Sequence, residues 1–293
     1  MPDQEYNEAS LAAQVASIEA CSRRFGTPCA DGELAWRRWG EGPPMVLLHG
    51  GTGSWMHWIH NVLPLSREHA VWVPDMPGFG DSAALPKGPR LETIAAVVAQ
   101  GIAQLVPGGQ VCLVGFSFGG LVGGFVAAAR PDLFRQFILV GAGGLGLREN
   151  RRLPLVAWRH LKNDSERMAA HRHNLAQLML WNEAKIDPLA LYIQSKNAAR
   201  SRINSGPYSR GDVLLEPLSR VKAPLHGIWG RHDPTTTGKL AEVEPLLRRT
   251  DSSAKVDVIE DAGHWVGYEA AEATNALLLA AARTQLRPAS LAS

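Results

Sequence analysis

Residues 111–129 read VCLVGFSFGGLVGGFVAAA, a stretch of 19 residues without a charged side chain. A helix of this length could cross a bilayer, but the composition changes at Ser117. Bulky and branched apolar residues come before it, whereas the residues after it include four glycines and three alanines. This pattern predicts a buried strand, a tight turn at Ser117 and a buried helix rather than a transmembrane segment.

The rest of the chain repeats this order of strand and helix on both sides of Ser117. Such alternation predicts an α/β fold: a mostly parallel central sheet with helices on both faces. A hairpin at Asp31-Gly32, between residues 24–30 and 33–39, is expected to come first. The expected strands are residues 45–48, 71–73, 111–114, 137–140, 225–229 and 256–259, and the expected helices are residues 11–23, 91–106, 118–130, 238–247 and 269–282.

The alternation stops after Gly141. From residue 145 to residue 212 only helical patterns occur, with 12 basic and 6 acidic residues. A segment this long is too large for a plain loop, so we predict a helical cap inserted into one domain. The division that follows is a helical extension at 1–30, an α/β core at 31–144 and 213–286, the cap at 145–212 and a tail at 287–293.

The composition is that of an ordinary globular protein, with 45% apolar residues, 20% charged residues and a net charge of +2. It excludes a disordered chain and argues against a nucleic-acid-binding protein, which needs a basic excess. Three cysteines without paired spacing predict neither a disulfide framework nor a zinc site, and the first ten residues lack the features of a signal peptide. We expect a cytoplasmic protein with no cofactor, no metal, and no membrane or nucleic-acid partner. Whether it forms a homo-oligomer stays open.

The turn at Ser117 lies in the pattern Gly115-Phe116-Ser117-Phe118-Gly119. A serine that links a strand to a helix in this pattern typically serves as a nucleophile, because small neighbours permit the strained turn that exposes its hydroxyl. A histidine held by a carboxylate must remove the hydroxyl proton. In this arrangement the acid and then the histidine follow the serine along the chain.

Order and placement select the acid and the histidine. Asp233 follows the expected strand at 225–229, whereas no acid follows the strand at 137–140 until Glu149. His264 is the one histidine beyond Asp233, in a loop after the strand at 256–259. We therefore predict a catalytic triad of Ser117, His264 and Asp233.

The carbonyl oxygen of a substrate gains negative charge during attack and needs waiting N–H donors. One predicted donor is the backbone N–H of Phe118, directly after the nucleophile. The other is the N–H of Gly51 in the glycine-rich loop after the strand at 45–48, with Thr52 as a helper. A helix-capping role for Thr52 or Ser54 is an alternative for this loop.

Five motifs, in this order along the chain, resemble those of the α/β-hydrolase fold superfamily. They are His49-Gly50-Gly51, the segment from Asp75 to Ser82, Gly115-x-Ser117-x-Gly119-Gly120, Gly230-Arg231-x-Asp233 and Gly263-His264-Trp265. The resemblance covers residues 33–282, with the cap as the variable part. It implies the α/β-hydrolase fold and the triad, and it assigns the Asp75–Ser82 segment a structural role.

Within this superfamily the chain looks most like esterases and meta-cleavage-product hydrolases, which break a carbon–carbon bond in ring-fission products. Trp265 after the histidine matches the second group. Phe116 stands where those enzymes usually carry Asn, and Gln194 stands near the place of their cap arginine. A serine nucleophile argues against haloalkane dehalogenases and epoxide hydrolases.

The predicted function is a serine hydrolase that cleaves a carboxylic ester of a small or medium, partly apolar or aromatic molecule through an acyl-enzyme. The alternatives are a hydrolase of vinylogous diketone acids and a slow-turnover ligand receptor. Predicted substrate contacts are Thr52, Phe116 and Trp265, with Arg200 and Arg202 as candidates for a carboxylate contact.

Two further groups of residues have both a functional and a structural interpretation. The pairs His57 and His60, and His171 and His173 in the cap, are expected to lie on the surface rather than in a metal site, because no further ligands gather near them in the sequence. Tryptophans could line an apolar pocket or pack in the core; those near the oxyanion loop or in the cap are Trp55, Trp58, Trp158 and Trp181.

Overall fold

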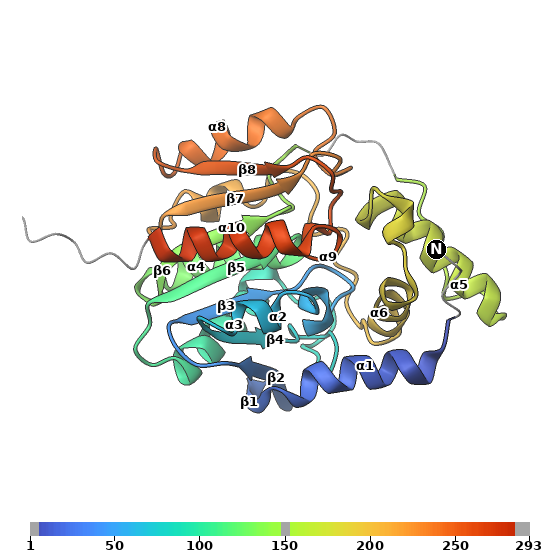
Figure 1. The fold of residues 1–293 in the computed structure, drawn as a ribbon. Helices are drawn as coiled ribbons and strands as arrows, with labels where there is room; N and C mark the ends of the chain where they lie inside the picture. The colour runs from blue at the N-terminus through green and yellow to red at the C-terminus, as the bar shows by residue number, and fades with distance from the viewer. Residues whose placement is uncertain (1–5, 148–152, 285–293) are drawn as a thin grey trace, which may run out of the picture.

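The computed structural model describes residues 6–147 and 153–284, so the predicted tail at 287–293 lies outside the described residues. An eight-stranded sheet forms the centre of the molecule, in the order β1-β2-β4-β3-β5-β6-β7-β8 (Figure 1). Strand β2 is antiparallel to both β1 and β4, and all other neighbours are parallel. The strands are β1 Arg23–Cys29, β2 Gly32–Trp39, β3 Pro44–Leu48, β4 Ala70–Pro74, β5 Val111–Phe116, β6 Phe134–Val140, β7 Leu225–Gly230 and β8 Lys255–Ile259.

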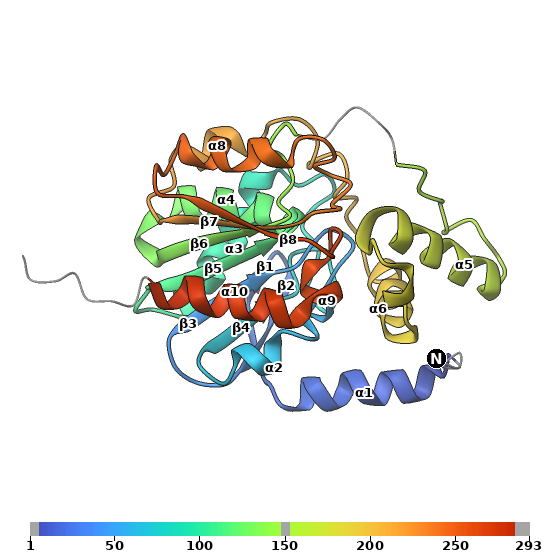
Figure 2. The same cartoon turned by 45° about the horizontal axis from the view of Figure 1, so that its top comes forward.

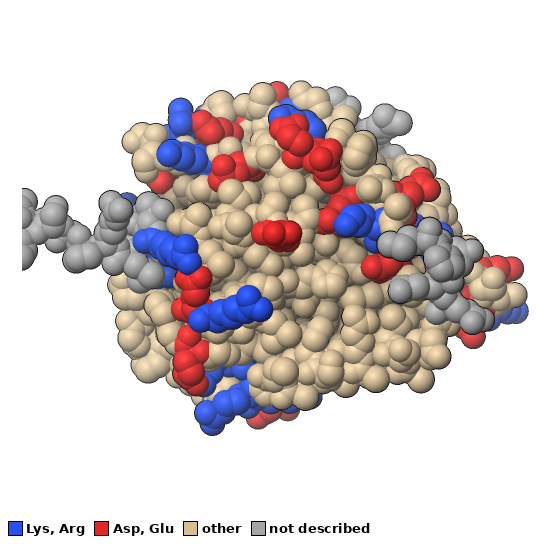
Figure 3. Space-filling model, viewed as in Figure 1, with Lys and Arg blue, Asp and Glu red and all other residues tan. Residues whose placement is uncertain are grey.

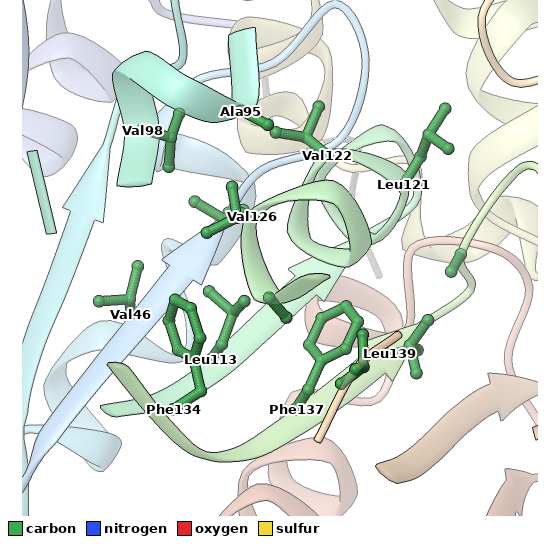
Figure 4. Close-up of a cluster of buried hydrophobic side chains, with 14 of the residues drawn as sticks. Val46, Ala95, Val98, Leu113, Leu121, Val122, Val126, Phe134, Phe137 and Leu139 are labelled. Atoms are coloured by element: carbon green, nitrogen blue, oxygen red, sulfur yellow. The ribbon is translucent and has the colours of Figure 1, made fainter. Parts of the chain in front are cut away.

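Alternating side chains of the central strands enter two separate hydrophobic cores. In β5, Leu113 joins the core beneath helix α4, whereas Val114 joins the core on the opposite face. In β6, Leu139 and Val140 divide in the same way. Both faces are therefore covered, which explains why these strands read as continuous apolar runs. Figure 4 shows the first core, where Val122 of α4 lies beside Ala95 of α3 and Val126 lies toward side chains from β3, β5 and β6.

The helices divide between the two faces of the sheet. Side chains of α3, α4, α7 and α8 enter the first core, and side chains of α1, α2, α9 and α10 enter the second. These helices are α1 Glu8–Ala20, α2 Val62–Leu65, α3 Leu91–Leu105, α4 Phe118–Ala129, α7 Leu215–Leu218, α8 Val243–Arg248, α9 Val266–Glu269 and α10 Ala271–Thr284. The α/β class with a mostly parallel sheet and helices on both faces is confirmed.

The predicted cap lies beside the sheet, where the two cap helices stand apart from the core in both views (Figures 1 and 2). The described part of residues 145–212 contains helices and helical turns but no strand. They are α5 Asp164–Asn174, a π-helical turn Leu175–Met179, a 3-10 turn Glu183–Lys185 and α6 Pro188–Ala199. Asp187 caps α6 by accepting the Ala190 N–H at 2.8 Å. Helix α1 contacts α6, and Glu8 forms an ion pair with Lys196 at 2.5 Å.

The N-terminal part differs from the prediction. Residues 1–30 are expected to form a helical extension, but β1 within them is an edge strand of the sheet. A side-chain contact helps to hold β1 on the sheet, because the buried Thr27 accepts a hydrogen bond from Trp36 Nε1 of β2 at 2.9 Å. The hairpin itself is present, with the turn at Ala30 and Asp31, one residue earlier than predicted. The core therefore starts at Arg23.

No helix in residues 6–147 or 153–284 is both long and apolar enough to span a bilayer. The stretch at 111–129 is the buried strand β5 followed by α4, as predicted. On the face shown in Figure 3, Lys and Arg are interspersed with Asp and Glu and form no extended basic patch.

A buried ion cluster joins α1, β2 and the turn after β4. Arg37 and Asp75 are 2% and 1% exposed, and the Arg37 guanidinium also contacts Glu19 at 2.6 Å and Asp81. The Asp75 carboxylate accepts the backbone N–H groups of Trp55 at 2.8 Å and Asp81 at 2.9 Å. Since Trp55 follows the Gly50–Ser54 loop, this cluster fixes the far end of that loop.

Candidate active site at the turn after the fifth strand

Ser117 occupies a sharp turn between β5 and α4, with φ 53° and ψ −112°. A positive φ is strained for a residue other than glycine, and such strain concentrates at functional sites. The neighbouring glycines are sterically required. A Cβ on Gly115 would lie 2.5 Å from the Gly119 carbonyl oxygen, and one on Gly119 would lie even closer to the Leu48 carbonyl oxygen. These contacts explain why the Gly-x-Ser-x-Gly pattern is needed at this turn.

The structure brings Ser117, His264 and Asp233 together. His264 Nε2 lies 2.9 Å from Ser117 Oγ, and His264 Nδ1 lies 2.8 Å from Asp233 Oδ2. The carboxylate can only accept, so Nδ1 carries the hydrogen and Nε2 offers its lone pair to the serine hydroxyl. His264 and Asp233 are 3% and 2% exposed. This arrangement can deprotonate the serine as it attacks a carbonyl.

The acid and the histidine are supported from the sheet. Asp233 follows β7 and His264 follows β8, so both lie at the carboxyl edge together with Ser117. Asp233 Oδ1 accepts from the N–H of Thr235 at 2.8 Å and from its hydroxyl at 2.6 Å. At the end of β6, a Cβ on Gly141 would lie 3.2 Å from both Asp233 Oδ2 and His264 Nδ1. A glycine with φ 52° leaves room for this pair.

The two predicted oxyanion donors lie on adjacent segments. The Phe118 N–H begins α4 and has no intrahelical acceptor, while a Cβ on Gly51 would lie 3.7 Å from Phe118 Cβ. Thr52 takes φ 52°, which is rare for a β-branched residue. Gly51, Thr52 and Phe118 line the same cavity as Ser117. Their role as donors and helper stays a prediction.

The glycine-rich loop rests on two buried neutral histidines. His49 donates from Nδ1 to the Gly50 carbonyl at 2.8 Å and accepts the Met76 N–H on Nε2 at 2.9 Å. His57 Nδ1 accepts the Gly50 N–H at 3.2 Å. Burial, aided by nearby His49 and His264, holds the pKa of His57 well below its ordinary value. The expectation that His57 lies on the surface is wrong, because the loop and Phe116 enclose it. The same expectation is wrong for His171, which is 2% exposed and packs against Trp158.

A cavity of about 570 Å³ opens over Ser117, between the core and the cap. Thr52, Phe116 and Trp158 line this cavity, and the roles of Thr52 and Phe116 as substrate contacts stay predictions. Trp55 and Trp58 are core residues instead. Trp181 is half exposed and stacks on His232 at 3.8 Å.

Three predicted substrate contacts lie elsewhere. Trp265 is buried and donates from Nε1 to the His57 carbonyl at 2.8 Å, so it packs within the core beneath the site rather than lining the cavity. Arg200 forms an ion pair with Asp81, and Arg202 donates to the Ser82 carbonyl. Neither arginine lines the cavity. The hypothesis that they bind a substrate carboxylate therefore needs correction, since both guanidinium groups are bound to the 75–82 turn.

Glu269 is a positioning residue that the sequence does not reveal. Its carboxylate is 5% exposed and accepts the Gly263 N–H at 2.7 Å, next to His264. It also accepts the N–H groups of Trp181 at 3.2 Å and Asn182 at 2.6 Å in the cap. Glu269 thus ties the His264 loop to the cap. An acid five residues after His264 is the only signal in the sequence, and it does not show which N–H groups the acid meets.

In the described part of the chain, no three or more His, Cys, Asp or Glu residues gather in a way that could hold a metal ion. Cys21, Cys29 and Cys112 are free thiols. Burial raises the pKa of the Cys112 thiol to about 12, so this group is inert at neutral pH.

Residues 45–277 match the model of the alpha/beta hydrolase family. The chain is 27% identical over 258 residues to a 2-hydroxy-6-oxo-6-phenylhexa-2,4-dienoate hydrolase of Burkholderia cepacia, covering 82% of this chain and 87% of that one. It is 35% identical over 238 residues to a pimeloyl-[acyl-carrier protein] methyl ester esterase of Aeromonas hydrophila, covering 78% and 90%. Among solved structures, a bacterial membrane phospholipase A superposes with a TM-score of 0.73 at 23% identity, covering 94% of this chain and 92% of that one.

Replacing Glu269 with Gln should lower kcat by about 10- to 100-fold with little change in KM, because a small displacement of a reacting group is costly. The side-chain amide in Glu269→Gln would keep one oxygen acceptor. Its NH2 group would face backbone N–H groups whose hydrogen bonds a carboxylate oxygen of Glu269 accepts. Steady-state kinetics of ester hydrolysis give kcat and KM separately. The matched control is Glu272→Gln, because Glu272 is an exposed acid on α10. A lower melting temperature with unchanged kcat would show that Glu269 only stabilises the fold.

Stability should fall as the pH drops below about 6.5, the ordinary pKa of histidine. The unfolded chain then binds a proton at residue 57, whereas the folded chain does not, because burial lowers the pKa of His57. Between pH 7.5 and 5.5, the loss of unfolding free energy should be about 1 kcal/mol smaller in His57→Gln than in the parent protein. Urea unfolding at both values measures this, with the exposed His160→Gln as control. An identical loss in all three proteins would contradict the account.

Proposed function

The chain belongs to the alpha/beta hydrolase family, and from that premise we propose that it is a serine hydrolase acting on a carboxylic ester. The hydrogen-bonded series Ser117–His264–Asp233, facing a cavity of about 570 Å³, is the observation that carries the proposal. The similarity to an esterase at 35% identity supports the choice of substrate class.

The reaction proceeds in two halves. Ser117 Oγ attacks the ester carbonyl while His264 Nε2 takes its proton, and Asp233 stabilises the imidazolium that forms. The N–H groups of Gly51 and Phe118 hold the developing oxyanion. His264 then protonates the leaving alcohol, which leaves an acyl group on Ser117. A water molecule, deprotonated by His264, attacks this acyl-enzyme and releases the carboxylic acid.

The substrate is a small or medium molecule with an apolar or aromatic part. The cavity volume is within the range of small-molecule sites. Phe116 lies on its core side and Leu155 and Trp158 on its cap side, so an apolar group would be well covered. Residues 145–212 act as the cap over this site, and the unpaired cysteines favour a cytoplasmic location.

Hydrolysis of a carbon–carbon bond in a vinylogous diketone acid is the second candidate. The dienoate hydrolase at 27% identity favours it. Phe116 in place of the usual Asn argues against it, as does Gln194, which lines the cavity in place of the cap arginine. A ligand receptor with very slow turnover ranks third, because both the hydrogen-bonded series and the glycine-rich loop are present.

Assays of simple aryl esters against a 2-hydroxy-6-oxo-dienoate should show Ser117-dependent ester hydrolysis with the higher kcat/KM. Ser117→Ala should remove at least about 10³-fold of the activity, because both halves of the reaction need the serine. Ser209→Ala is the control, since Ser209 also lines the cavity but lies outside the hydrogen-bonded series.

Two results would contradict the proposal. A preference of several orders of magnitude for the dienoate would favour carbon–carbon bond hydrolysis. The absence of both a burst and turnover with activated esters would favour the receptor.

A further inference from the structure

One wall of the cavity is made by residues 204–211, which return from α6 to the core and are called the return segment below. Tyr208 donates its hydroxyl to the Pro89 carbonyl at 2.6 Å, and the Gly211 carbonyl accepts the Gly146 N–H at 2.8 Å. Ser209 packs on Gly143, where an added Cβ would lie 3.0 Å from Ser209 Cβ. The backbone of this wall is therefore held at several points by the core.

Arg210 lies in this fixed wall, where it is exposed to solvent and lines the cavity. Apart from His264, it is the one charged or titratable side chain among the described lining residues, and no Asp or Glu lines the cavity. Its guanidinium makes no hydrogen bond or ion pair with any described residue, in contrast to Arg200, which pairs with Asp81. An unpaired guanidinium, with its planar fork of N–H groups, is suited to bind a carboxylate through two hydrogen bonds.

A second part of the cavity lining has a different character. It comes from residues 153–179 of the cap and, apart from Asn174, is apolar: Leu153, Leu155, Trp158, Leu178 and Met179. The return segment adds uncharged polar side chains, and Ser205 lies against Gly51, so that a Cβ on Gly51 would collide with it. The lining of the cavity therefore combines an apolar group from residues 153–179 with a polar group and one cation from the return segment, and Ser117 belongs to the same lining.

We propose that Arg210 binds an anionic group of the substrate, so that the preferred ester carries a carboxylate on one part and an apolar group on another. This inference rests on the proposed ester hydrolysis and adds a substrate class to it. The positive charge raises the local concentration of anionic substrates and orients them, since nothing acidic in the described lining neutralises it. Arg210 takes over the role first considered for Arg200 and Arg202.

Matched ester pairs test the inference. The first pair, 4-nitrophenyl hexanoate and 4-nitrophenyl hydrogen adipate, differs by a carboxylate on the acyl side. The second pair, phenyl acetate and 4-acetoxybenzoate, differs by a carboxylate on the alcohol side. Arg210→Ala should raise KM for the anionic member of at least one pair by about tenfold, the usual effect of losing a charge-assisted hydrogen bond. The neutral members should change by less than about twofold.

Three further variants test whether the positive charge at residue 210 sets the preference for anionic esters. Arg210→Lys should retain part of the preference, and Arg210→Glu should lose more of it than Arg210→Ala. Arg220→Ala is the matched control, because Arg220, two residues after α7, is exposed like Arg210 but pairs with Glu216 at 3.0 Å and does not line the cavity. The preference in the parent protein should weaken as salt is added.

The failure of this inference and the failure of the proposed function give different results. If the parent protein hydrolyses the neutral esters through Ser117, but Arg210→Ala changes both members of each pair equally, only the role of Arg210 is overturned. The same holds if Arg220→Ala has as large an effect as Arg210→Ala. If no ester is hydrolysed faster than by Ser117→Ala, the hydrolase activity itself fails, and this inference fails with it.

Discussion

The backbone turn at Ser117 is the constraint on which the rest of the site depends. Its N–H donates to the Val140 carbonyl at 2.8 Å, so the turn is fastened to β6, while Gly115 and Gly120 let α4 approach the sheet. One turn thereby exposes the hydroxyl, directs the first N–H of α4 to the same space and fixes both relative to β7 and β8. The strain at φ 53° is tolerated because the buried sheet and helix on either side determine the conformation.

Hydrogen bonds join the loop that carries His264 directly to the helical segment at residues 179–187. The Trp265 N–H donates to the Met179 carbonyl at 2.8 Å, and Tyr268 donates its hydroxyl to Asp187 at 2.6 Å. Together with the contacts of Glu269, these bonds place His264 between the sheet and residues 179–187. A rearrangement of that part of the cap would therefore change the support of the proposed general base, and access to the cavity and chemistry are physically linked.

The sequence predicts the central strands and the turn well, because both depend on short-range patterns. Strands buried on both faces must be apolar throughout, and a nucleophile turn needs glycines at fixed spacing. Predictions that depend on contacts distant in sequence are less successful. His57 is a polar residue in a helical pattern, which predicts a surface position, yet the Gly50–Ser54 loop folds over it. Arg200 pairs with Asp81, which is 119 residues away in the sequence. The hairpin of β1 and β2 is predicted, but the division of the chain places β1 in a helical extension, since only its pairing with β2 in the full sheet shows that it belongs to the core.

Covalent labelling with diisopropyl fluorophosphate, followed by peptide mass mapping, tests most directly whether these three side chains work as one unit. The account predicts a single adduct in which Ser117 Oγ has displaced fluoride from phosphorus, at a rate that falls strongly in His264→Ala and vanishes in Ser117→Ala. An adduct on another residue, or labelling of Ser117 that is as fast without His264 as with it, would contradict the account.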